Sequence, residues 1–255
     1  MEYERTEDGQ IQADFALRAG QLLVQYDHLR HQLPSEQQFE ATLTIALLQS
    51  MLTMCHELLR NRHPRNPSKS LEELLSMAKR TLDAEPTLLG LTKECVLERW
   101  PSARGVTYRD VVECIRNALS HPLPQQPGSL PRTGFTTELS GSGQVTAYVF
   151  TQSEWVESSG SRLKSVYVPK AGKDVGLEAM KKKVDLWASN NRVDGIDFVL
   201  ENGFWKVVLN GTQFIPVCRI RLDVAQLRIF TTGLSDYLSE PAREDTKHQV
   251  HREVA

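Results

Sequence analysis

The chain has 255 residues, 40% of them hydrophobic and 24% charged, which is enough for one large domain or for a domain with a sizeable insert. Lysines and arginines number 30 against 32 aspartates and glutamates, so the net charge of −2 excludes a globally basic nucleic-acid binder and leaves only a local basic surface. The longest nearly apolar run, 43–55, is too short to cross a bilayer, so we expect no membrane contact. The first residues are acidic and polar, unlike a secretory signal, and the four cysteines are isolated, so we expect neither disulfides nor a metal site. Both features are typical of a cytoplasmic protein.

Helices are predicted to dominate the first 125 residues. Apolar side chains at helical spacing indicate helices over 11–33 and 35–60, the second with Ser35 as its cap. A capping-box pattern at 70–73 begins a third helix that is expected to end near residue 84.

Two shorter segments lie between these helices and the next one. The basic run 60–67 is interpreted as a solvated loop, with a contribution to phosphate binding as the alternative. A short helix is expected around 92–99, in a stretch interrupted by prolines and glycines.

Strands follow a linker rich in proline and glycine at 122–131. Residues 134–139 and 144–151 are predicted to form a hairpin, and a further strand is expected at 163–168. One amphipathic helix is expected at 176–189, and its run of three lysines is interpreted as a solvated face rather than an RNA-facing patch.

Asn-Gly pairs then indicate tight turns between three more strands, which are predicted to form a meander: 196–201, 204–209 and 213–222. Pro216 indicates that the last of them is an edge strand or is bulged, because proline cannot donate to a strand ladder. Residues 223–238 return to helix, with Asp223 as the cap and an apolar face that needs a partner surface.

These elements predict an α+β fold, in which an α-helical bundle carries a β-rich insertion before its closing helix. The bundle would take residues 1–125, the insertion 132–222 with its one helix, and the closing helix 223–239 would return to the bundle. The charged tail, 240–255, is expected to be disordered.

Segment 107–121 combines a strong apolar helical face with a concentration of polar chemistry. Its apolar side chains recur at 108, 111, 112, 115, 118 and 119, and Pro122 ends the helix because the residue before a proline is driven out of the α region. The polar side chains of the opposite side and of the helix end are Arg109, Glu113, Arg116, Asn117, Ser120 and His121. The helix dipole favours a protonated imidazole at this end, so Arg116 and His121 indicate a site for an anion, with phosphate as the obvious one.

Helix geometry limits how Arg116 and His121 could share one ligand. They lie five positions apart, so an ideal helix would direct them about 140° apart. Either the imidazole swings back where the helix frays, or a second copy across a two-fold axis completes the site.

The run Arg116-Asn117-Ala118-Leu119-Ser120-His121 resembles the motif of the HEPN superfamily, small helical bundles with Arg-x(4–6)-His near the end of a late helix. The order of helices, β-rich stretch and closing helix is similar to that of the bacterial plasmid-type HEPN nucleases. The family often has glycine after the histidine, where this chain has Pro122. A second match of the spacing, Arg243 to His248, falls in the polar tail without an apolar face and is interpreted as accidental.

The resemblance implies a metal-independent endoribonuclease that needs no cofactor and acts as a homodimer with both motifs lining a shared cleft. Arg116 would bind the scissile phosphate, His121 would transfer protons, and Asn117 and Ser120 would position groups in the catalytic site. Substrate binding would also involve the neighbouring pair Arg109 and Glu113. By analogy with the family, the protein would be a toxin or antiphage effector that acts on RNA, with an inhibitory antitoxin as a candidate partner.

Simpler interpretations exist for the same residues. Glu113 lies three positions before Arg116 and four before Asn117, so an intrahelical ion pair and hydrogen bond would explain both, and His121 would simply cap the helix. The alternative functions are a non-catalytic RNA- or nucleotide-binding HEPN module, and a structural or interaction protein whose insertion recruits a partner.

Overall fold

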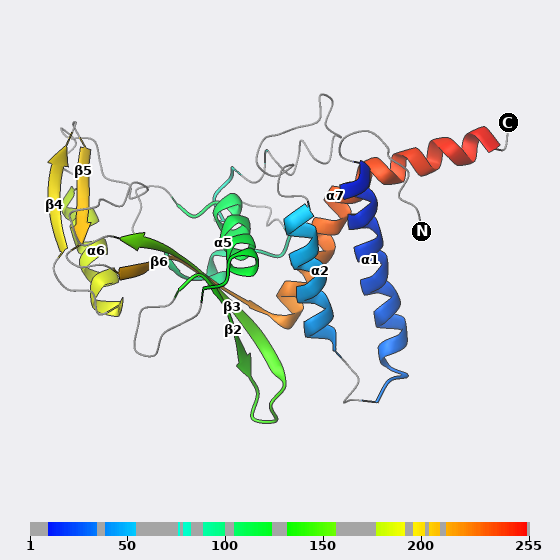
Figure 1. Cartoon of the computed structure of the whole chain (residues 1–255), viewed down its shortest axis with the longest axis horizontal. Coiled ribbons are helices and arrows are strands. Elements are labelled where there is room, and N and C mark those ends of the chain that lie inside the picture. Colours follow the sequence, from blue (N-terminus) through cyan, green and yellow to red (C-terminus); the bar gives the residue numbers. More distant parts are fainter. Residues whose placement is uncertain are drawn as a thin grey trace.

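The computed structural model describes residues 10–34, 39–54, 76, 79–82, 89–99, 105–123, 132–156, 177–191, 196–201, 204–209 and 213–253. Within them the fold is α+β (Figure 1). The helices are α1 (Gln10–Arg30), α2 (Glu40–Met54), α5 (Tyr108–Ser120), α6 (Leu177–Asn191) and α7 (Val224–Glu253). The strands are β1 (Val96–Arg99), β2 (Gly134–Leu139), β3 (Val145–Val156), β4 (Ile196–Glu201), β5 (Phe204–Leu209) and β6 (Gln213–Asp223). No described helix is long and apolar enough to span a membrane.

Four of the strands form one antiparallel sheet in the order β1-β6-β3-β2, and β4 and β5 pair separately as a hairpin. Phe150 of β3 is paired with Phe135 of β2 on one side and with Ile220 of β6 on the other. Residues opposite one another in antiparallel strands point to the same face, so these three side chains lie on one face of the sheet. Phe150 and Ile220 are fully buried there.

The helices and the sheet share one hydrophobic core. α5 packs against β2, β3 and β6 on one side and against α2 on the other, and α2 packs in turn on α1 and α7 (Figure 1). The core unites buried side chains from all these layers, among them Met51, Ile115, Phe150, Ile220 and Phe230. The sheet is therefore the platform on which α5 rests.

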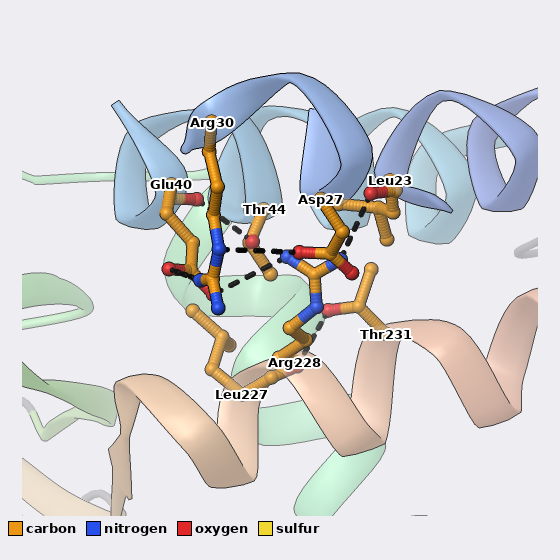
Figure 2. Close-up of polar contacts among 8 residues, drawn as sticks. All are labelled: Leu23, Asp27, Arg30, Glu40, Thr44, Leu227, Arg228 and Thr231. Carbon is orange, nitrogen blue, oxygen red and sulfur yellow. Dashed lines mark hydrogen bonds and ion pairs between the residues drawn. The ribbon is translucent and has the colours of Figure 1, made fainter. Parts of the chain in front are cut away.

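Ion pairs join the three long helices beside this core. Arg228 of α7 donates to the carboxylates of Asp27 in α1 and Glu40 in α2, and to the backbone carbonyl of Leu23 at 2.9 Å (Figure 2). Arg30 bonds Glu40 at 2.6 Å and lies 3.9 Å from Asp27. Two cations thus alternate with two carboxylates, and their charges cancel.

Several expectations from the sequence are met closely. The helix predicted at 107–121 is α5, and the hairpin predicted at 134–151 is formed by β2 and β3. α7 begins after Asp223, whose carboxylate accepts a hydrogen bond from the N–H of Gln226, and its predicted inward residues are buried: Leu227, Phe230, Leu234 and Leu238.

Other expectations are wrong. The residues expected to form a short helix at 92–99 form a 3-10 turn, Lys93–Cys95, followed by β1. β6 does not continue a meander from β5 but lies between β1 and β3, so it is not an edge strand. The other alternative drawn from Pro216 is confirmed, because the backbone of β6 is bulged between Pro216 and Cys218. The third predicted helix does not reach residue 84, because Thr81 forms an isolated bridge with Thr107.

Two predicted boundaries also differ. β1 precedes the predicted insertion, 132–222, yet belongs to the same sheet, so the sheet crosses the expected division of the chain. α7 continues through Glu253, where a disordered tail was expected, and in Figure 1 its C-terminal part extends past the beginning of α1. The predicted Ser35 cap, the loop 60–67, the capping box at 70–73, the strand 163–168 and the two Asn-Gly turns lie outside the described residues.

Candidate functional site

A capping box fixes the start of α5. The Thr107 hydroxyl accepts from the N–H of Asp110, and the Asp110 carboxylate accepts from the N–H of Thr107 at 2.8 Å. Arg99 of β1 adds an ion pair to the same carboxylate, also at 2.8 Å. Burial raises the pKa of Asp110, but the Thr107 N–H and the charge of Arg99 outweigh it, so the pKa is lowered below its usual 3.8.

The inner face of α5 lies on the sheet. The Cys114 thiol is fully buried 3.5 Å from the carbonyl oxygen of Cys218 and 3.9 Å from that of Phe150. Burial raises the pKa of this thiol well above 9.0, and the neighbouring Cys218 raises it further. Cys114 therefore stays a neutral packing residue.

Two hydrogen bonds define the C-terminal end of α5. His121 leaves the helical conformation at φ −134° and ψ 53°, and its backbone N–H closes the last turn on the Asn117 carbonyl at 3.0 Å. The side-chain amide of Gln49 in α2 donates to the carbonyl of Leu119 at 3.2 Å. The end of the motif helix is thus held partly by a residue 70 positions earlier in the chain.

The predicted catalytic residues gather at this end. The Arg116 guanidinium donates from Nη1 to Oδ1 of Asn117 at 2.8 Å, and both side chains are half-buried. Arg116 Nε and the Ser120 hydroxyl are buried atoms without a hydrogen-bond partner. The side chain of His121 is exposed and makes no hydrogen bond or ion pair to another described residue. Buried polar atoms without partners are rare in folded proteins and need an explanation.

The two predicted substrate-binding residues pair with each other. Arg109 bonds Glu113 at 3.0 Å, with more than two-fifths of each side chain exposed. The simpler interpretation, in which Glu113 binds Arg116, does not hold, since the described bond of Arg116 is to Asn117. Arg109 and Glu113 lie one to two turns before the motif, as an ordinary exposed helical pair.

The start of β2 lies next to the end of α5. Leu123 donates its N–H to the carbonyl of Thr133 at 2.8 Å, and a Cβ added to Gly134 would lie 3.9 Å from the Cα of Pro122. The first residues of β2 therefore lie beside the last residues of α5. Sequence reasoning identified the motif but neither Gln49 nor this junction, because both depend on tertiary packing.

No group of three or more His, Cys, Asp or Glu side chains in the described part of the chain is placed to hold a metal ion. Comparisons of the chain with protein-family models, curated proteins and solved structures gave no match.

Proposed function

We propose that the protein is an HEPN-like endoribonuclease that cleaves RNA without a metal ion, with Arg116 and His121 as its catalytic residues. The observation that carries the proposal is the polar end of α5. An arginine, an amide and a hydroxyl, two of them with buried atoms lacking partners, lie there among the last five residues of α5, directly before an exposed histidine. The resemblance of this run to the HEPN motif supplies the reaction class.

The chemistry of RNA fits these groups. Each phosphate lies beside a 2′-hydroxyl, so cleavage requires removal of the hydroxyl proton, in-line attack on phosphorus and protonation of the leaving 5′-oxygen. The products are a 2′,3′-cyclic phosphate and a 5′-hydroxyl. Both proton transfers suit an imidazole, which gains and loses protons near neutral pH.

Arg116 is suited to the charge that develops on the phosphate. Its bond to Asn117 fixes the plane of the half-buried guanidinium, whose positive charge can stabilise a bound phosphate. The Ser120 hydroxyl lies one turn later at the same end, buried and without a partner among the described residues. Asn117 therefore acts as a positioning residue for Arg116, and Ser120 as a substrate-positioning residue.

A homodimer is part of the proposal. The five-residue separation directs Arg116 and His121 about 140° apart on an ideal helix. A two-fold axis near the end of α5 would place the arginine of one protomer beside the histidine of its partner. Action in the cytoplasm as a toxin or antiphage effector, held by an inhibitory antitoxin, follows from the family analogy alone.

The test is a cleavage assay on total RNA in EDTA, comparing wild type with Arg116→Ala and His121→Ala. We expect each variant to lose about a hundredfold or more of the activity, because each removes a group that acts in the transition state. The matched control is Arg243→Ala with His248→Ala, the second occurrence of the same spacing, which should cleave like wild type. Wild-type products should carry cyclic-phosphate ends.

Circular dichroism of each variant distinguishes a catalytic loss from unfolding. Folded motif variants that cleave at the wild-type rate would refute the assignment. A folded wild type that binds RNA without cleaving it would indicate the non-catalytic binding module, and one without RNA affinity would indicate an interaction protein.

A further inference from the structure

One aromatic ring stands exposed next to the end of α5. Phe135, the second residue of β2, is 41% exposed although it lies on the face of the sheet that carries the buried Phe150. Tyr148 and Ile220, on the same face, are only 4% and 0% exposed. Phe135 lies on β2, an edge strand of the sheet.

The backbone places this ring beside the histidine of the motif. Gly134 packs against Pro122, and Phe135 and His121 are each one residue away from that contact. The hydrogen bond from Leu123 to Thr133 fixes the two segments side by side. Phe135 and His121, both exposed, thus lie on neighbouring backbone segments where α5 ends and β2 begins.

The ring of Phe135 packs against two aromatic side chains of β3. Its centroid lies 6.0 Å from that of Tyr148 and 6.2 Å from that of Phe150, both in tilted arrangements. These are the separations at which aromatic pairs attract each other. One side of the Phe135 ring is therefore packed and the rest faces solvent, which makes it a rigid platform.

We propose that Phe135 stacks on an unpaired nucleobase of single-stranded RNA, next to the phosphate that His121 and Arg116 would cleave. This inference rests on the proposed function and gives the sheet a part in substrate recognition. A nucleobase lies close to each phosphate, and proteins that bind single-stranded RNA commonly stack such bases on aromatic side chains. Stacking does not depend on base identity, so Phe135 selects unpaired RNA rather than a sequence.

The same strand offers a matched control. Leu139 is 59% exposed at the far end of β2, away from the end of α5. It is as apolar and as accessible as Phe135 but lies outside the proposed site. A contribution from general hydrophobic contact would involve both residues, whereas stacking near the cleaved phosphate involves only Phe135.

The experiment measures binding of a fluorescein-labelled single-stranded RNA that wild type cleaves, in the His121→Ala background to prevent cleavage. Phe135→Ala and Phe135→Leu should each weaken binding about tenfold, since stacking of one base is lost. Phe135→Trp should bind at least as tightly as the parent, and Leu139→Ala should bind equally. Phe135→Leu retains apolar packing against Tyr148 and Phe150, so its thermal unfolding should stay close to that of the parent.

An abasic RNA gives the decisive comparison. Removing the base beside the cleaved phosphate should weaken binding to the parent about tenfold but should not weaken binding to Phe135→Ala further. If wild type cleaves RNA while Phe135→Ala binds like the parent, or the two losses simply add, stacking on Phe135 is refuted and the proposed nuclease stands. If wild type neither binds nor cleaves RNA, both proposals fail together.

Discussion

The side-chain amide of Gln49 in α2 donates a hydrogen bond of 3.2 Å to the backbone carbonyl of Leu119 in the last turn of α5. The last carbonyls of a helix have no partner within the helix, and they are commonly satisfied by water or by side chains. Here the partner comes from another helix of the core. The orientation of the motif's final turn, and with it the direction of His121, depends on the packing of α2 against α5.

Replacing Gln49 by alanine should disturb this turn more than it disturbs the fold. We expect Gln49→Ala to lower the free energy of unfolding by about 1 kcal/mol, because one partly exposed hydrogen bond is lost. Cleavage of RNA should fall several-fold. Gln25→Ala, the same change at an exposed position of α1, serves as the control and should alter neither urea denaturation nor cleavage.

Asp110→Asn should weaken the start of α5 and change its response to acid. The charged acceptor for Thr107 and the ion pair with Arg99 are lost, which should cost about 2 kcal/mol at pH 7. Because folding lowers the pKa of Asp110, its contribution is fully present above the usual 3.8 and disappears as the pH falls through the lower folded value.

Urea denaturation of wild type and Asp110→Asn at several pH values checks this sign. The difference between the two proteins should be constant above about pH 5 and should shrink below about pH 4. The control is Glu113→Gln in the same helix, which breaks an exposed pair and should cost at most about 0.5 kcal/mol. A difference for Asp110→Asn that grows in acid would contradict the prediction.

Arg228→Leu should destabilise the joint between α1, α2 and α7. Arg228 is 17% exposed and contacts both Asp27 and Glu40, so its removal leaves two partly buried carboxylates with only Arg30 between them. We expect a loss of about 2 kcal/mol, measured by thermal or urea unfolding.

Asp14→Asn weakens the Arg18–Asp14 pair within α1, which is partly exposed to solvent, and is the matched control, with an expected change near zero. The double variant Arg228→Leu with Asp27→Leu should recover part of the loss, because the carboxylate left behind is removed as well. A single variant as stable as wild type would show that solvent replaces the ion pairs.

Gly134→Ala should strain the junction beside the motif. Gly134 has φ +152°, a conformation that residues with a Cβ rarely adopt, although space for the methyl group exists 3.9 Å from Pro122. The cost should therefore be backbone strain of about 1 to 3 kcal/mol rather than a clash. RNA binding should weaken as Phe135 shifts, whereas Gly141→Ala in the hairpin turn, with open space around it, should do little.

The sequence predicts those parts of this fold that have a local periodic signal. α5 is identified correctly because Tyr108, Val111 and Ile115 recur at helical spacing and all three are buried. The pairing of β6 is missed because the nearby Asn-Gly pair indicates a local hairpin, whereas Ile220 pairs with Phe150 and Val96. A partner strand that lies far away in the chain leaves no trace in local spacing.

The residues of the candidate site likewise fall into those that local spacing predicts and those that only tertiary packing reveals. Arg116, Asn117, Ser120 and His121 can be placed on one helix end from their spacing alone. That Gln49 reaches this end, and that Phe135 lies exposed beside it, follows only from the packing of α2 and β2 against α5. Nothing in the sequence around either residue distinguishes it from its neighbours.

The order in which the chain is made has a bearing on when such a site could exist. α1 packs on α7 through Ser235 and Ala16, which lie 219 positions apart, and β1 meets β6 through Glu98 and Arg219, 121 positions apart. A nascent chain on the ribosome that ends before β6 has made α5 but not the strand beneath it. Contacts this distant slow folding. The helix end that would cut RNA is therefore assembled only after synthesis has passed β6.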